Sequence, residues 1–242
     1  MNGPITDQEE ARAQDLLNRA RRLQVLAAAL TYPEPGSGHV KAIGQDLAWL
    51  VAATDDAPVA LTGLLAAWMA CDEERLRAEH GRLFLGQTLC PLHAAAYGSA
   101  RNLAGPAADL ADISGFYQAF GMDLRIDMPE RPDLLIVQLE FYASLLIREA
   151  YARVQGWQDA LEIATDAARA FLQDHLGRWR GVLGEGLTRC EARAPLPELA
   201  AWLDLLLEAE CEDRAVAPEP FGGPAREAVS ADAFTCPHAG GA

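Results

Sequence analysis

Two short pairs of cysteine and histidine are the residues in this sequence best suited to chemistry. The first is Cys90-Pro-Leu-His93 and the second is Cys236-Pro-His238. Thiolate and imidazole groups are common zinc ligands, and these four side chains could complete a tetrahedral site. Pairs this short also arise by chance, and the second lies in a segment rich in proline, glycine and alanine. A shared metal site is therefore one hypothesis, and two unrelated pairs are the alternative.

Sequence signatures of catalysis are missing. There is no Gly-x-x-x-x-Gly-Lys phosphate loop, no Gly-x-Ser-x-Gly nucleophile motif and no His-Glu-x-x-His motif. Adjacent carboxylates such as Glu9-Glu10 and Glu73-Glu74 are typical of a solvated helix face. We therefore predict that the chain is not an enzyme. A Cys/His metal-binding protein or metal-dependent enzyme remains the alternative.

Two other segments combine polar, proline and aromatic residues in a way that core packing does not require. The first runs from Glu79 to His93 and is followed by Tyr97, and the second runs from Met128 to Tyr142. We refer to them as motif 1 and motif 2. Their residue types suit the recognition of a partner better than the filling of a core.

The segments around these motifs have apolar residues at helical spacing, which predicts that helices position the motifs. Thr6-Asp7-Gln8-Glu9 is a capping-box pattern that predicts a helix start. A further long helix is predicted over 134–153, with Pro132 in its first turn. The pattern predicts an all-α fold, a single bundle-like domain of eight or nine helices over residues 1–212. The loop near 122–130 could join two halves, and residues 213–242 are predicted to be a weakly structured tail.

Charge limits the partners of such a chain. The 242 residues contain 20 Lys and Arg against 35 Asp and Glu, a net charge of −15. A chain this acidic repels phosphate backbones, so nucleic-acid binding is not expected and a basic partner is favoured. No apolar run reaches about 18 residues, so no membrane insertion is expected. Five scattered cysteines do not form a disulfide framework, which favours a reducing, cytoplasmic location.

The two motifs, with a third pattern between them, resemble the TorD/DmsD/NarJ family of cytoplasmic molybdoenzyme chaperones. The first similarity is Arg82-Leu83-Phe84-Leu85-Gly86 with Pro91 and Tyr97. The second is Glu130-Arg131-Pro132-Asp133 followed by Leu139-Glu140-Phe141, and the third is the helix end 115–121. Leu134 stands where the family usually has histidine, so no role of that histidine carries over.

The resemblance implies an all-helical chaperone. Such a protein binds the apo catalytic subunit of a molybdenum oxidoreductase of the dimethylsulfoxide reductase family, together with its twin-arginine signal peptide, and assists cofactor insertion before export. No cofactor is expected to be stably bound, beyond transient contact with the client's molybdopterin guanine dinucleotide. A monomer or a homodimer is expected.

A twin-arginine signal peptide has two basic residues before an apolar helix, so its receptor needs acidic residues beside an apolar groove. Between residues 123 and 140 the sequence contains five carboxylate side chains and only two arginines, Arg125 and Arg131. The predicted client-binding residues are Asp123, Asp127, Glu130, Asp133, Leu134, Glu140 and Phe141, with Arg82, Phe84 and Tyr97 from motif 1. Two alternatives stay open: Glu130 and Asp133 could complement a helix dipole, and Arg82 could be a structural ion-pair partner.

Overall fold

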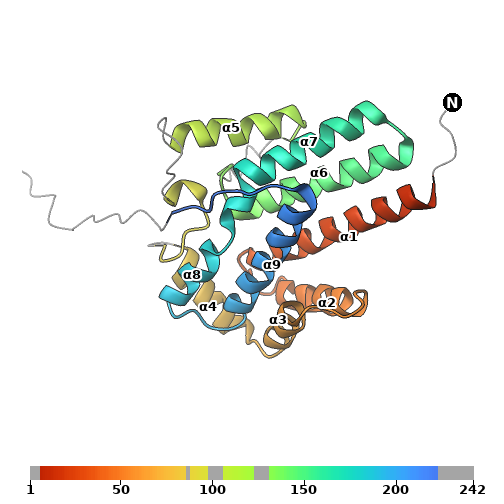
Figure 1. The fold of residues 1–242 in the computed structure, drawn as a ribbon. Coiled ribbons are helices and arrows are strands. Elements are labelled where there is room, and N and C mark those ends of the chain that lie inside the picture. Colours follow the sequence, from red (N-terminus) through yellow and green to blue (C-terminus); the bar gives the residue numbers. More distant parts are fainter. Residues whose placement is uncertain (1–5, 86–87, 98–105, 123–130, 223–242) are drawn as a thin grey trace, which may run out of the picture.

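The computed structural model describes residues 6–85, 88–97, 106–122 and 131–222, and these are mostly helical (Figure 1). The predicted all-α fold is confirmed for this part of the chain. Its elements are α1 (Asp7–Leu30), α2 (His39–Ala52), α3 (Val59–Met69), α4 (Glu73–Phe84), the 3-10 turn η1 (Ala94–Ala96), α5 (Pro106–Ala119), α6 (Leu135–Gln155), α7 (Gln158–Asp174), the 3-10 turn η2 (Leu176–Trp179), α8 (Val182–Arg189) and α9 (Leu196–Arg214).

Helix α1 begins as the capping box predicts. The Thr6 hydroxyl accepts a hydrogen bond from the Glu9 backbone N–H at 3.2 Å, and acidic residues fill the first turn, where they complement the helix dipole. Residues at helical spacing form a buried stripe along one face: Leu16, Ala20, Leu23, Ala27 and Leu30. This stripe packs α1 most extensively against α6.

Helix α6 is the central element and starts later than predicted. Its N-cap is Leu134 in an extended conformation, so Pro132 precedes the helix instead of occupying its first turn. The reason is tertiary: Asp133 and Leu135 bond to a segment far away in the sequence, as described below. The helix ends at Gly156, whose φ of 66° is left-handed and favours glycine. Helices α1 and α7 cover two of its faces, and most of its side chains are buried.

The boundary predicted after residue 212 is placed too early. Helix α9 continues through Asp213 and Arg214, and the chain then runs back across η2 to bury Pro218 and Phe221. The composition of the segment suggested a loose tail, but the contacts of these residues are with distant helices. Residues 223–242, which make up the rest of that predicted tail, lie outside the described part.

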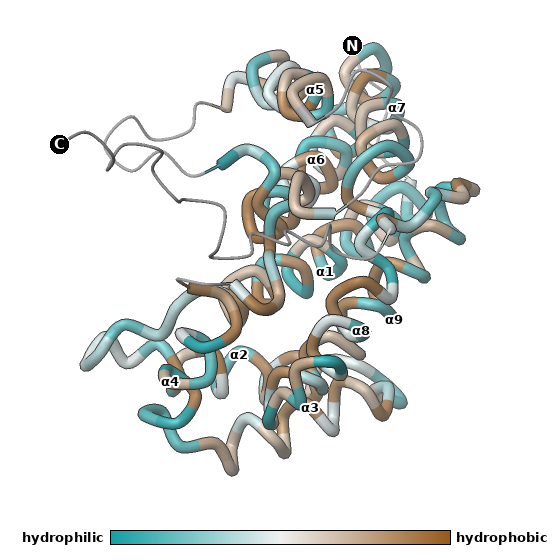
Figure 2. Tube along the Cα trace, turned by 90° about the vertical axis from the view of Figure 1, so that its left-hand side faces the viewer, coloured by the Kyte–Doolittle hydropathy of each residue, from teal (hydrophilic) through white to brown (hydrophobic). Residues whose placement is uncertain are grey.

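The described elements share one hydrophobic core. It extends from Ala13 in α1 through α6 and α7 to Phe221, so elements before and after residues 122–130 do not form two separate halves. The side view in Figure 2 shows α2, α3, α4 and α8 gathered below α1, α5, α6 and α7, with α9 between the two groups. The loop 123–130 itself lies outside the described residues. Within the described part, no helix is both long and apolar enough to cross a membrane.

Candidate functional site

Motifs 1 and 2 meet directly through their backbones. His93 and Leu134 form an isolated antiparallel bridge. The Leu135 N–H donates to the Leu92 carbonyl at 2.8 Å, and the Ala94 N–H donates to the Asp133 carbonyl at 3.1 Å. We call the paired segments 90–97 and 131–135 the motif junction. Sequence reasoning identified both segments but did not predict that they pair.

Asp133 holds the motif junction together. Its side chain is 2 % exposed, and its carboxylate accepts hydrogen bonds from the Ala95 N–H and the Arg131 Nε, both at 2.9 Å. Its carbonyl oxygen also accepts from the Gln138 side chain at 3.0 Å. Its carboxylate and its carbonyl oxygen are therefore both used within the protein. Its role in the structure is to link the two motifs, and it is not free to pair with an external arginine.

Hydrogen bonds from two buried tyrosines stabilise the motif junction. The Tyr97 hydroxyl donates to the Pro91 carbonyl at 2.7 Å, and the Tyr117 hydroxyl donates to the Pro132 carbonyl at 2.8 Å. Burial raises the pKa of both phenols far above the ordinary value, so both remain protonated donors. They tie η1 and α5 to the chain on either side of the junction.

Replacing Asp133 tests this structural role. We expect Asp133→Asn to lower the free energy of unfolding by about 1–3 kcal/mol, because charge-assisted hydrogen bonds become weaker or are left unmade in a buried place. Chemical denaturation of the two chains gives the difference. Arg131→Gln is the comparison and should cost less, since the Arg131 side chain is 50 % exposed and the Asp133 carboxylate keeps its hydrogen bond from the Ala95 N–H. A larger loss from Arg131→Gln than from Asp133→Asn would contradict this assignment.

The predicted aromatic contacts with a client are core residues in this structure. Phe141 is fully buried and packs against the rings of Phe116, Tyr117 and Phe171. Tyr97 and Phe84 are also buried, the latter with its ring 4.8 Å from that of His80. These side chains are covered in this structure, and Tyr97 is covered in part by the ring of Phe221.

Arg82 pairs with a neighbour in motif 1 and not with the acids of motif 2. Its guanidinium contacts both Glu79 carboxylate oxygens, at 2.7 and 3.0 Å, and reaches the Cys190 carbonyl at 3.1 Å. The Arg82 hydrogen bond lowers the pKa of Glu79 despite the opposing effect of burial. The pair lies in a cavity of about 520 Å³ between α4 and the loop before α9. The structural alternative for Arg82 is the one that the geometry favours.

The predicted acidic receptor is only partly within the described residues. Asp123, Asp127 and Glu130 lie outside them. Of the others, Asp133 is buried in the junction, whereas Glu140 is exposed on the first turns of α6 and Leu134 is half-buried at its N-cap. Of the predicted receptor residues in motif 2, Glu140 and Leu134 are therefore the described ones that reach the surface.

The metal hypothesis receives no support from the residues that can be placed. Burial raises the pKa of the Cys90 thiol to about 11, which disfavours the thiolate that a metal needs. Burial lowers the pKa of His93, which favours the neutral imidazole and does not itself count against a metal. Within the described ranges, no three His, Cys, Asp or Glu side chains gather closely enough to hold a metal ion. Cys236 and His238 lie outside those ranges.

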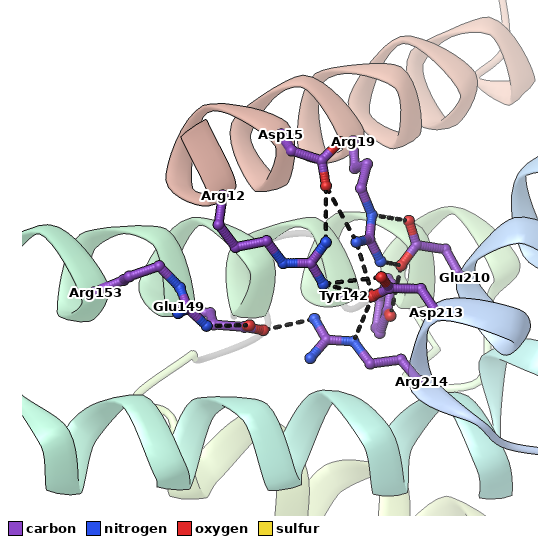
Figure 3. A network of polar contacts seen from close by, with 9 residues as sticks. All are labelled: Arg12, Asp15, Arg19, Tyr142, Glu149, Arg153, Glu210, Asp213 and Arg214. Atoms are coloured by element: carbon purple, nitrogen blue, oxygen red, sulfur yellow. Dashed lines mark hydrogen bonds and ion pairs between the residues drawn. The ribbon is translucent and has the colours of Figure 1, made fainter. Parts of the chain in front are cut away.

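A second polar cluster was missed by sequence reasoning. It joins α1, α6 and α9, and Figure 3 shows its arginines and carboxylates alternating. Arg19 binds both Glu210 carboxylate oxygens, Tyr142 donates to Glu210 at 2.8 Å, and Arg214 pairs with Glu149 at 2.5 Å. The remaining members are Arg12, Asp15, Arg153 and Asp213. Each cation in this interhelical cluster has a carboxylate partner, which is the pattern of a structural network.

One sequence feature could have pointed to this cluster. Arg12 and Arg19 are seven residues apart, so they lie on one face of α1 beside its buried stripe. Their partners Glu210 and Asp213 are about 200 residues away, and the latter falls in the predicted tail. Burial and two arginines act in opposite directions on Asp213, and the hydrogen bonds of Arg12 and Arg19 prevail and lower its pKa.

Comparison with known proteins gives a family match and two similar sequences. The family model described as nitrate reductase delta subunit matches residues 51–184, more than half of the chain. A 70-residue stretch is 40% identical to the chlorate reductase assembly chaperone protein of Ideonella dechloratans and 41% identical to the selenate reductase assembly chaperone protein of Thauera selenatis. Each match covers 29% of this chain and 35% of the relative, about a third of the relative's length.

A crystal structure from Archaeoglobus fulgidus assigned to redox enzyme maturation is also similar. It matches 78% of this chain and 93% of its own, at 16% identity and a TM-score of 0.45. That score is too low to relate the two folds in detail.

Proposed function

Because the chain belongs to the nitrate reductase delta subunit family, we propose that it is a chaperone that assists assembly of a molybdenum oxidoreductase. The observation that carries the proposal is the extent of the family match. Residues 51–184 include motif 1, motif 2 and the whole motif junction that joins them. The two relatives named as assembly chaperones, one for chlorate reductase and one for selenate reductase, support the same function.

The proposed client is the apo catalytic subunit of such an enzyme, held in the cytoplasm until its cofactor is inserted. In this proposal the chain recognises the client through the client's twin-arginine signal peptide. A net charge of −15 favours a basic segment electrostatically, and steering of this kind raises the association rate. In this proposal the chain supplies binding and catalyses no reaction.

The structure changes which acids are proposed to meet the peptide. Asp133 serves the junction, so the proposed receptor carboxylates are Asp123, Asp127, Glu130 and Glu140, beside Leu134. Tyr117 bonds to Pro132, and Met122 bonds through its N–H to the Tyr117 carbonyl at 2.9 Å. Residues 122 and 132 are thus anchored to the same tyrosine. We infer that this anchoring fixes the positions of the two described residues, Met122 and Pro132, that flank the segment.

Co-purification tests the proposed function. The chain is produced in its native host with an affinity tag, and captured proteins are identified by mass spectrometry. We expect a molybdoenzyme catalytic subunit whose twin-arginine signal is uncleaved. Capture of no such subunit, together with one bound metal ion per chain, would favour the Cys/His alternative and overturn the chaperone proposal.

Charge reversal then tests the proposed receptor. We expect Glu130→Lys with Glu140→Lys to weaken capture of the client about tenfold or more, since attraction to two arginines becomes repulsion. Binding of the unaltered chain should also weaken as salt rises, because exposed ion pairs are screened. Asp159→Lys with Glu162→Lys is the matched control, because both are exposed acids on α7 and the change in net charge is the same. An equal loss with the control would show that only net charge matters.

A further inference from the structure

The last described residues of the chain pack against side chains and backbone of the protein's own surface. We call this contact surface the groove, and its residues are Tyr97, Gln173, Gly177, Arg178 and Trp179. Helix α9 ends with Ala215 in a left-handed conformation, and residues 216–222, here called the strap, turn back across α7 and η2 toward η1 (Figure 1). The strap has no regular secondary structure. It lies along the fold as an extended peptide would lie in a binding site.

Side chains of the groove recognise the strap's backbone. The Gln173 amide exchanges two hydrogen bonds with Ala217, accepting from its N–H at 3.0 Å and donating to its carbonyl at 3.2 Å. The Arg178 Nε donates to the Glu219 carbonyl at 3.2 Å, and the Phe221 N–H donates to the Arg178 carbonyl at 3.0 Å. Contacts to main-chain groups are available to any extended peptide, because they do not depend on its side chains.

Two positions add side-chain selectivity. Pro218 rests on Gly177, where a Cβ atom would come within 2.6 Å of the proline ring. Phe221 is enclosed by the Tyr97 and Trp179 rings at 6.1 and 5.4 Å, and the Arg178 guanidinium lies 4.2 Å from its centroid. The groove therefore accepts the pattern proline-x-x-phenylalanine in an extended conformation.

Phe221 is the main anchor of the strap. The two hydrogen bonds of Gln173 are exposed, and each contributes less to stability than the burial of one large aromatic ring. The strap is thus held by few contacts for a segment that covers buried aromatic residues.

The groove also has a donor that the strap leaves unused. The indole N–H of Trp179, a fully buried ring against Phe221, finds no hydrogen-bond partner among the described residues. Such a donor is costly to leave unpaired, so a better ligand could gain by offering it a carbonyl oxygen. The groove is continuous with the motif junction, because Tyr97 belongs to both.

We propose that this groove is a docking site for an extended client segment that carries proline-x-x-aromatic, and that the strap is its built-in competitor. The identity of the partner rests on the proposed function, whereas the peptide chemistry is derived from the strap. A client segment would displace Phe221 and gain the rings of Tyr97 and Trp179, next to the segment that pairs with motif 2. Client binding would then be coupled to release of the strap.

A peptide added in trans tests the groove in the full chain. The probe is a fluorescein-labelled peptide with the sequence of residues 215–222, and binding is measured by fluorescence anisotropy. We expect it to bind Phe221→Ala at least tenfold more tightly than the unaltered chain, because the variant's own strap is loosened and its groove is intact. Pro220→Ala, an exposed strap position, is the matched control and should behave like the unaltered chain.

Two further variants keep the test decisive. Pro218→Ala loosens the strap at its other anchor and replaces Phe221→Ala if thermal melting shows that the latter is unfolded. Adding Gln173→Ala to the loosened chain should weaken peptide binding about tenfold, since Gln173 makes two hydrogen bonds to the peptide backbone. Equal affinity of the peptide for the loosened and unaltered chains, or an affinity unchanged by Gln173→Ala, would overturn the proposal.

Displacement of the labelled peptide by the client is the last measurement. The catalytic subunit captured by co-purification should release the labelled peptide from Phe221→Ala. A subunit that binds this variant and leaves the peptide in place overturns the docking proposal and spares the chaperone function. If no subunit is captured, the proposed chaperone function and the proposed identity of the partner both fail. The anisotropy measurement still decides whether the groove binds an added peptide.

Discussion

Glu210→Gln is expected to lower the free energy of unfolding by about 3 kcal/mol, the lower end of the range for breaking a buried ion pair. Glu210 is nearly buried, and its carboxylate is shared by Arg19 and the Tyr142 hydroxyl. The amide removes the charge opposite a guanidinium whose side chain is only 10% exposed. Asp213 still contacts Arg19 at 2.8 Å, which keeps the loss from being greater.

Urea denaturation measures this loss, and two controls make it specific. Tyr142→Phe removes one hydrogen bond from the same carboxylate and should cost about 1 kcal/mol. Glu208→Gln, in an exposed pair with Arg180, should cost under about 1 kcal/mol. A Glu210→Gln chain no less stable than Glu208→Gln would show that the interhelical cluster does not hold α1, α6 and α9 together.

Ending the chain at residue 212 is expected to lower the melting temperature by about 10 °C or more. This deletion removes Asp213 and Arg214, and it leaves the Glu149 side chain, 2% exposed, without its Arg214 partner. It also removes Phe221 from the rings of Tyr97 and Trp179. A loss of about 3–5 kcal/mol for the buried pair alone corresponds to roughly 10 °C at this chain length.

A chain that ends at residue 222 is the matched comparison, because it keeps every described contact. Differential scanning calorimetry of the two shortened chains and the full one isolates the contribution of residues 213–222. If the chain ending at 212 melted together with the chain ending at 222, residues 213–222 would be the dispensable tail that their composition suggests. That composition is a weak guide here, because a few contacts with distant helices outweigh it.

Local physical chemistry explains which features were predictable. The start of α1 follows from the hydroxyl of Thr6 and the carboxylates after it, and its buried face follows from apolar residues at helical spacing. The same reasoning places the helix predicted over 134–153 within about two residues of the observed α6. The helix end noted at 115–121 agrees with Gly121, where φ is 66°.

The candidate site shows where that reasoning stops. Asp133 follows a proline and precedes an apolar helix, so a helix-dipole role or a partner-binding role suited it equally well. Its carboxylate instead bonds to the backbone of Ala95, 38 residues earlier in the chain. Phe141 has the same ambiguity, because an aromatic residue in a polar motif can face a partner or the core.

By itself, the sequence determined the all-α class, the two motifs and the acidic balance of this protein. These properties depend on interactions within a few residues of one another or on composition, and both can be read from the chain directly. Only the tertiary structure decided that motif 1 pairs with motif 2, that Arg19 meets Glu210, and that the strap covers Tyr97. Each of these contacts joins residues from 38 to more than 190 positions apart, and their partners are selected by how the helices pack around one core.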